Sequence, residues 1–525
     1  MRSRTRNRRA SMQWQLSVAA STLVATGCTG VAEQQSNPGP TVGYADAACP
    51  AEISAVILAD VTCGYLTLPE RRDQPDSEHT VKLLVTRIQP PEPPTEEPMF
   101  VAGSDLGSSL DYGGIAPLAE RVAREVIFLA SRGTAYSEPA LECPEVEEVG
   151  DADLASPTDD PDTRATYLDA VAACHRRLTD GGIDLSAYNL TEMAADAENL
   201  RQALGIDMWN VITYGTAARI AMEMLRTAPG PIRTVTLDSP ELPGADPRVT
   251  AVQGTRDAIA AVLDACADDS ACGANYPHVR ESFDRALSAV DGNPVTVTLA
   301  DQPPDGRTVS VRVDAAMLVR IVRQMLSEGA GLRHPRAVPR MLDAVLAGRI
   351  DELVEITTAF VGDGPYCNGY QTRCVPLYHH ALGVVFSTLC HDIAPFVDPA
   401  APVRLAGTEI GFDAAYGRSP YLDVCDSWPA GEAPAEVAEP VRSEVPVLAI
   451  IGAYGPYVRP DQAREEMGDF PNLSIVVAPT DGHNVVAKTD CMLNIRNGWV
   501  DEPAMDPTGA DCFAGARVAW DLDLP

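Results

Sequence analysis

Short runs of apolar and β-branched residues alternate along this chain with segments whose apolar residues recur at helical spacing. The strand-like runs are residues 81–88, 99–102, 126–129, 208–212 and 234–237, and the helical patterns between them include 191–204 and 217–226. This order predicts a mostly parallel sheet flanked by helices, because parallel strands are joined by crossovers that cover the sheet. The expected fold class is therefore α/β.

The region from about residue 245 to 385 has a different pattern. It contains long helical segments at 249–267 and 317–326, with one apparent strand at 294–299. Strand-like runs return at 445–451 and 474–477. A helical cap inserted into an α/β sheet is the simplest description of this order.

The N-terminus has the features of an export signal. Five arginines within the first nine residues precede a mostly apolar stretch, 14–26, which is too short to span a bilayer. We therefore predict a signal peptide at residues 1–27. Small residues directly before Cys28 resemble a bacterial lipobox, which would make Cys28 a lipidated N-terminus; an ordinary cleaved signal is the alternative. Residues 28–48 then form a polar tether, and the protein is exported, either lipid-anchored at the cell membrane or extracellular.

The cysteines agree with an oxidising compartment. Of thirteen cysteines, twelve remain after Cys28, and an even number suits disulfides. The simplest hypothesis pairs neighbours in sequence: Cys49 with Cys63, Cys143 with Cys174, Cys266 with Cys272, Cys367 with Cys374, Cys390 with Cys425, and Cys491 with Cys512. Zinc sites need close Cys or His spacing that this chain lacks, so no metal is expected.

Charge and motifs narrow the partners. The chain has 40 basic and 74 acidic residues, and its net charge of −34 repels phosphate backbones. We therefore expect no nucleic-acid binding, and membrane contact only through a lipid on Cys28. No glycine-rich phosphate loop or dinucleotide fingerprint follows a strand, so no cofactor is expected.

The segment Met208 to Gly215, MWNVITYG, runs from a strand into a tight turn and then a helix, which is the context of a nucleophile elbow. This segment resembles the pattern W-N-x-x-G-x-S-Y-G-T of the secreted tripeptidyl-aminopeptidase-like (TAP-like) α/β-hydrolases. Further pieces of the resemblance are Asp196–Gly205, Arg132–Pro144, Cys425–Trp428 and Asp481–His483. The resemblance implies an α/β-hydrolase core at 49–244 and 386–525, with a cap at 245–385.

In such hydrolases a serine attacks a carbonyl, a histidine accepts its proton, a carboxylate orients the histidine, and backbone N–H groups bind the oxyanion. In this chain the nucleophile position falls on Thr213, and Val211 stands where the first elbow glycine belongs. The elbow residue needs positive φ, which a β-branched side chain tolerates poorly. No G-x-S-x-G occurs anywhere in the sequence.

The acid position is also altered. The family reads approximately G-x-x-D-P-x-x-P, and Gly455 stands where the aspartate belongs. Asp392 and Asp461 are the nearest substitutes, although the sequence places neither beside the histidine. Only His483 is in its expected place, and it could equally be a histidine that packs at the edge of the sheet.

The oxyanion loop differs as well. It reads Gly103, Ser104, Asp105, and the backbone of Tyr214 would complete the hole. A carboxylate in this loop would oppose the negative charge that develops during acyl transfer. The sequence therefore predicts an impaired or inactive protein that binds a peptide, ester or acyl ligand, or another envelope component, in a pocket under the cap. The alternative is an active peptidase or esterase with Thr213 as nucleophile and His483 as base.

Overall fold

A computed structural model describes most of the chain from residue 43 onward. The described residues are 43–56, 60–74, 78–94, 96–103, 123–302, 307–327, 334–349, 351–354, 357, 381–417, 421–468, 470–486, 489–507 and 511–522. The predicted signal peptide, Cys28 and most of the tether lie outside this range. Residues 40–525 form one compact unit.

One mixed sheet organises the unit, with the strand order β1-β2-β3-β5-β4-β7-β8-β11-β12. Its strands are β1 (Gly43–Ala47), β2 (Val61–Pro69), β3 (Thr80–Ile88), β4 (Met99–Val101), β5 (Val126–Leu129), β7 (Trp209–Tyr214), β8 (Ile232–Asp238), β11 (Val447–Gly452) and β12 (Leu473–Ala478), and the short β6 (Ser137–Glu138) pairs with β3. The strands from β5 to β12 run parallel, whereas β1, β2 and β3 pair antiparallel. The predicted α/β class is confirmed.

Alternate residues along the strands enter two hydrophobic cores on opposite faces of the sheet. Val211 packs with α5 (Leu190–Ala203) and α6 (Ala218–Thr227), while its neighbour Ile212 packs with α16 (Asp490–Asp501). The short helix α1 (Ala51–Val56) lies on the same side as α16. Strands covered on both faces explain why the central runs are apolar throughout rather than alternating.

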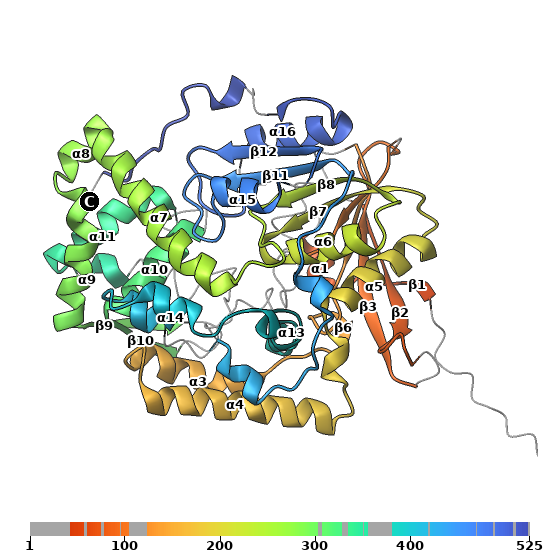
Figure 1. Ribbon diagram of the computed structural model, residues 1–525, viewed down its shortest axis with the longest axis horizontal. Coiled ribbons are helices and arrows are strands. Elements are labelled where there is room, and N and C mark those ends of the chain that lie inside the picture. Colours follow the sequence, from red (N-terminus) through yellow and green to blue (C-terminus); the bar gives the residue numbers. More distant parts are fainter. Residues whose placement is uncertain are drawn as a thin grey trace, which may run out of the picture. The chain divides into compact units, whose positions relative to one another are not determined.

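A separate group of helices and one hairpin follows β8, and we call this group the cap. It comprises α7 (Pro247–Asp268), α8 (Ser270–Asn275), α9 (Ser282–Gly292), α10 (Ala315–Ser327) and α11 (Val338–Ala347), with the hairpin β9 (Val295–Gln302) and β10 (Arg307–Val313). The cap has its own hydrophobic core, against which Val518, Trp520 and Leu522 of the C-terminal segment pack. Figure 1 shows the cap helices in green, facing the ends of β11 and β12. The predicted cap boundaries at 245 and 385 stay predictions.

The remaining helices surround the core and the cap. They are α3 (Pro144–Ala155), α4 (Pro161–Asp180), α13 (Leu382–Thr388), α14 (Ala401–Ala406) and α15 (Pro460–Glu466). Helix α3 lies against both α4 and the cap strand β10. Among the described residues, no helix combines the length and the apolar character that a membrane crossing requires.

Five of the six predicted cysteine pairs are disulfides in the structure. They join Cys49 to Cys63, Cys143 to Cys174, Cys266 to Cys272, Cys390 to Cys425 and Cys491 to Cys512. The sixth predicted pair, Cys367 with Cys374, lies outside the described residues. Each bridge closes a short loop, so its stabilising effect acts mainly by restricting the unfolded chain locally.

A fully buried ion pair joins the sheet to α5. The Arg132 guanidinium is 0% exposed and donates two hydrogen bonds to Asp196, at 2.8 and 2.7 Å. It also donates to the carbonyls of Glu70 and Ala187. The motif Arg132-Gly133 and the helix carrying Asp196 were both part of the family resemblance, and the structure gives them a shared structural role.

We expect Asp196→Asn to destabilise the protein by about 3–5 kcal/mol, because it removes the hydrogen-bonded counter-charge of a buried guanidinium and leaves it only the more distant carboxylate of Glu192, at 3.3 Å. Urea unfolding of the disulfide-intact protein measures this change. Asp264→Asn is a matched control, since Asp264 pairs with Arg280 where both side chains are at least half exposed. Equal midpoints for the two variants would contradict the assignment.

Candidate active site

The sequence-predicted site residues meet at one edge of the sheet. Because β4, β7, β8, β11 and β12 are parallel, the loops that follow them all start at the same edge. The predicted oxyanion residue Gly103, acid position Gly455 and histidine His483 follow β4, β11 and β12, respectively, whereas the predicted nucleophile Thr213 lies within β7, one residue before its end. In Figure 1 this edge faces the cap.

The sharp turn of the elbow lies at Gly215, two residues beyond the predicted nucleophile. Gly215 has a φ of 52°, and it separates β7 from the helical segment that continues into α6. Thr213 is instead an ordinary strand residue, paired with Leu237 of β8. Its side chain is 0% exposed, and its hydroxyl has no hydrogen-bond partner among the described residues.

A signal for this register was present in the sequence. Counting along W-N-x-x-G-x-S-Y-G-T from Trp209 and Asn210 puts the serine at Gly215, whereas counting back from Tyr214-Gly215-Thr216 puts it at Thr213. The two counts differ because this chain is two residues shorter between the ends of the pattern. The backbone follows the first count, since only the residue at 215 has the positive φ of an elbow.

The oxyanion loop is described only at its start. Gly103 has a φ of 131°, and a Cβ built on it would lie 3.3 Å from Ala217 at the start of α6. Ser104 and Asp105 lie outside the described residues. The backbone N–H of Tyr214, which was predicted to complete the oxyanion hole, instead donates to the carbonyl of Gly103 at 3.3 Å.

Gly455 lies beside the histidine loop, where an acid would have to be. A Cβ on Gly455 would come 3.0 Å from the carbonyl oxygen of Gly482, the residue before His483. The backbone N–H of Tyr454 donates to the carbonyl of Asp481 at 3.0 Å. The loops after β11 and β12 are therefore packed backbone to backbone, and position 455 offers no carboxylate.

The two proposed substitutes for the acid are engaged with other partners. Asp392 accepts hydrogen bonds from His391 at 2.8 Å and from the N–H of Leu190 at 3.0 Å, and burial raises the pKa of its carboxyl. Asp461 is exposed, and its hydrogen bonds with Arg459 lower its pKa. Both carboxylates are thus held by groups other than His483.

His483 is buried, with 7% of its surface exposed, and its ring centroid lies 4.5 Å from that of Tyr457. The loop that follows it is held by the end of β8. Asp238 accepts from the backbone N–H groups of Val485 and Val486, at 2.9 and 2.7 Å. Ser239 accepts from the N–H of Asn484 at 3.1 Å and donates to Asp238 at 3.0 Å.

Sequence reasoning missed this Asp238–Ser239 clamp. Two of the three described non-glycine residues with positive φ, Ser239 and Asn484, meet in it. Such backbone conformations are costly and persist where the surroundings enforce them, often at functional sites. The sequence did contain a signal for this clamp, namely the polar pair Asp238-Ser239 at the end of a buried strand. Polar residues at that position lie at the edge of the sheet where the site forms.

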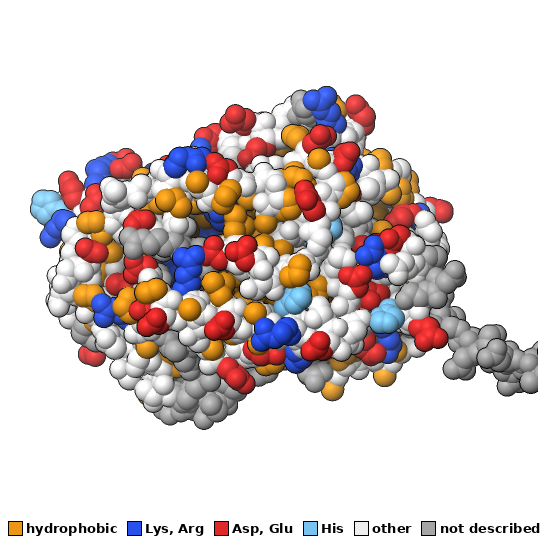
Figure 2. Space-filling view, turned by 60° about the horizontal axis from the view of Figure 1, so that its bottom comes forward, with side chains coloured by type: hydrophobic (Ala, Val, Ile, Leu, Met, Phe, Trp, Pro, Cys, Tyr) orange, Lys and Arg blue, Asp and Glu red, His pale blue; other side chains and the backbone are white. Residues whose placement is uncertain are grey.

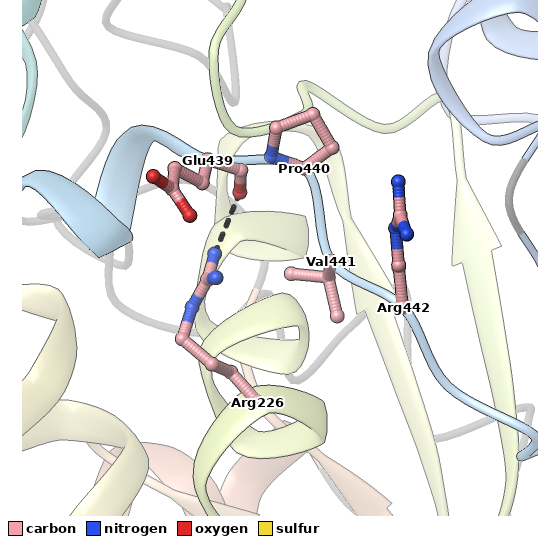
Figure 3. A pocket seen from close by; sticks show the side chains of 5 residues that line it. All are labelled: Arg226, Glu439, Pro440, Val441 and Arg442. Atoms are coloured by element: carbon pink, nitrogen blue, oxygen red, sulfur yellow. Dashed lines mark hydrogen bonds between the residues drawn. The ribbon is translucent and has the colours of Figure 1, made fainter.

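A pocket of about 600 Å³ lies away from this edge, lined by Arg226, Glu439, Pro440, Val441 and Arg442. Figure 3 shows Arg226 and Arg442 on either side of Val441, with Arg226 bonded to the carbonyl of Glu439 at 2.7 Å. Arg226 is in the last turn of α6, roughly 12 Å along that helix from its first residue, Ala218, which follows the elbow turn. This pocket is therefore separate from the elbow. No cluster that could hold a metal ion occurs among the described residues.

The parallel sheet, the elbow at Gly215 and the histidine loop after β12 define an α/β-hydrolase fold. Residues 412–512 match the family described as TAP-like protein, which confirms the predicted resemblance in that part of the chain. No curated protein matches the chain significantly.

Solved structures similar to this chain include other α/β-hydrolases. Proline iminopeptidase from Mycobacterium smegmatis is 12% identical, with a TM-score of 0.37, over 83% of this chain and 98% of that chain. A thermophilic esterase from Thermogutta terrifontis is 9% identical, with a TM-score of 0.35, over 83% and 98%. Haloalkane dehalogenase DbeA from Bradyrhizobium elkani is 12% identical, with a TM-score of 0.35, over 85% and 100%.

We expect Asp238→Asn to cost about 3 kcal/mol of stability, because a fully buried carboxylate that accepts charge-assisted hydrogen bonds is replaced by an amide. The same change should speed hydrogen exchange at residues 484–486. Chemical denaturation and exchange mass spectrometry measure the two effects. Asp461→Asn, at an exposed carboxylate, is the control, and similar effects from both variants would argue against the clamp.

Proposed function

We propose that this protein is a binding protein built on a peptidase- or esterase-like α/β-hydrolase scaffold, without hydrolytic turnover. The observation that carries this proposal is Gly215 at the turn of the elbow. A glycine there has no hydroxyl to attack a carbonyl, and Gly455 supplies no carboxylate to orient His483. Losing triad members typically costs about 10⁴–10⁶ in kcat, so little activity would remain.

The alternative, an active hydrolase that uses Thr213, has less support. A nucleophile must reach the substrate, and the side chain of Thr213 is 0% exposed within a central strand. Thr213 pairs with Leu237 of β8, so it lies within the sheet and not at the turn that follows β7. The burial of Thr213 therefore favours the binding role.

The proposed ligand is a peptide, ester or acyl group held between the cap and the sheet edge. Sites of this kind commonly lie between a cap and the carboxyl ends of parallel strands. On the face that Figure 2 shows, basic side chains are interspersed with acidic ones rather than gathered into a broad basic surface. Together with the net charge of −34, this supports a ligand other than a polyanion.

We further propose that the protein is exported and anchored to the membrane by a lipid on Cys28. The five disulfides support export, because such bridges form and persist mainly in oxidising compartments outside the cytosol. The lipid is supported by the small residues before Cys28 alone.

Fluorophosphonate labelling tests the missing nucleophile. We expect no labelling of the natural protein, slow labelling of Gly215→Ser, and faster labelling of Gly215→Ser combined with Gly455→Asp, because a restored acid orients His483. Gly215→Ala is the matched control, since it adds the same Cβ without a hydroxyl. Labelling of the natural protein that disappears in Thr213→Ala would instead establish the active alternative.

Metabolic labelling with a fatty-acid analogue tests the anchor. We expect the natural protein to incorporate the label and to sediment with membranes, and Cys28→Ser to lose both properties because no thiol remains to be acylated. Cys367→Ser is a control that removes a cysteine elsewhere. Membrane sedimentation that survives Cys28→Ser would contradict the anchor but leave the binding role untouched.

A further inference from the structure

The cap meets the sheet edge through contacts that concentrate around His483. A Cβ on Gly482 would lie only 1.7 Å from the carbonyl oxygen of Leu326 in α10, and a Cβ on Gly254 in α7 would lie 2.3 Å from the carbonyl oxygen of Pro456. Two cap helices thus touch the loops after β11 and β12 at positions where only glycine fits. These are close approaches of backbone, and they bring side chains of the cap within reach of the histidine loop.

The side chain of Tyr457 lies between the histidine loop and the cap helix α10 and contacts both. Its ring centroid lies 4.5 Å from that of His483, with the two planes at 53°. The Arg323 guanidinium of α10 lies 4.5 Å from the same ring, a cation–π arrangement. The Tyr457 hydroxyl lies 3.1 Å from the hydroxyl of Ser327, which is at the end of α10. One side chain therefore contacts both the cap and the histidine.

The surroundings fix each partner of Tyr457. Ser327 is buried, and its hydroxyl oxygen lies 2.7 Å from the carbonyl oxygen of Arg323 as well as 3.1 Å from the Tyr457 hydroxyl. The chain directly after His483 is held as well, because the backbone N–H groups of residues 484–486 are bound by Asp238 and Ser239. A shift of α10 would move Tyr457, and a shift of Tyr457 would remove the ring against which His483 packs.

We propose that Tyr457 is a positioning residue that couples docking of the cap to the placement of His483. The inference goes beyond the proposed function, because it holds whether His483 binds a ligand or transfers a proton. It also gives a reason for a histidine in a site without a nucleophile or an acid: His483 is the core's packing partner for the residue that holds the cap.

Beside the backbone contact of Gly482 with Leu326, a second side-chain link runs in parallel with that of Tyr457 and must be separated from it. The Nε2 atom of His334, just before α11 of the cap, lies 3.7 Å from a carboxylate oxygen of Asp481 in the histidine loop. This contact does not involve Tyr457. An effect that passes through Tyr457 must therefore survive in His334→Ala, which removes the second link only.

Hydrogen exchange on the full-length protein tests the coupling. We expect Tyr457→Ala and His483→Ala each to speed exchange of the α10 amides by about tenfold, because a ring contact supporting the cap is lost. The double variant should be no faster than Tyr457→Ala alone, since His483 reaches α10 through Tyr457. The proposal would be overturned if the two substitutions had additive effects on α10 exchange, or if His483→Ala left α10 exchange unchanged.

Tyr457→Phe distinguishes positioning from general loss of packing, and it keeps the test available where Tyr457→Ala does not fold. It retains the ring on His483 but loses the hydroxyl contact with Ser327. We expect faster exchange in α10 with unchanged exchange at residues 481–486, and the same result from Ser327→Ala. Faster exchange in both regions would contradict a coupling that acts through the ring.

Tyr276→Phe is the matched control. The Tyr276 hydroxyl donates a hydrogen bond, at 3.1 Å, to the carbonyl of Asp521 in the C-terminal segment. It belongs to the core of the cap but makes none of the contacts described for Tyr457. The Tyr276→Phe variant should speed hydrogen exchange in the C-terminal segment while leaving exchange at residues 481–486 unchanged. Faster exchange at residues 481–486 in Tyr276→Phe would show that any loosening of the cap reaches the loop, which would overturn the specific role of Tyr457.

Discussion

The carboxyl edge of the sheet is packed backbone against backbone, and the rest of the site depends on this packing. The end of β11 presses on the histidine loop at Gly452, where a Cβ would come 1.7 Å from the carbonyl oxygen of Gly482. Gly482 in turn meets the cap at Leu326. No side chain could be inserted at either glycine without separating the layers. The sheet edge, the histidine loop and the cap can therefore contact one another this closely only because Gly452 and Gly482 have no Cβ atom.

The fold is stabilised by interactions that do not depend on a catalytic reaction. The buried pair Arg132–Asp196, the clamp of Asp238 on residues 485 and 486, and the disulfides all stabilise the fold independently of any reaction. The elbow at Gly215 keeps the backbone turn while lacking the reactive hydroxyl. Glycine adopts this turn without strain, so Gly215 carries no conformational penalty there.

Much of the fold followed from periodicity. The strand predicted at 126–129 coincides with β5, and the helix predicted at 217–226 differs from α6 by one residue at each end, because buried parallel strands and amphipathic helices leave strong local patterns. The site was less predictable. Thr213 and Gly215 are two residues apart, and the family pattern fits both counts, so the register depended on which residue the backbone turns at. The clamp of Ser239 on Asn484 joins residues 245 positions apart and leaves no local pattern.

The sequence by itself determined the α/β class, the disulfide partners that are described, and the absence of a serine elbow, because each of these depends on local pattern or on residue identity. Tertiary structure decided which residue occupies the elbow and which groups surround His483. Those outcomes depend on φ at single residues and on contacts between loops after different strands. Such contacts arise only when parallel strands bring their carboxyl ends to one edge, where Gly215, Gly455, Asp238 and His483 lie.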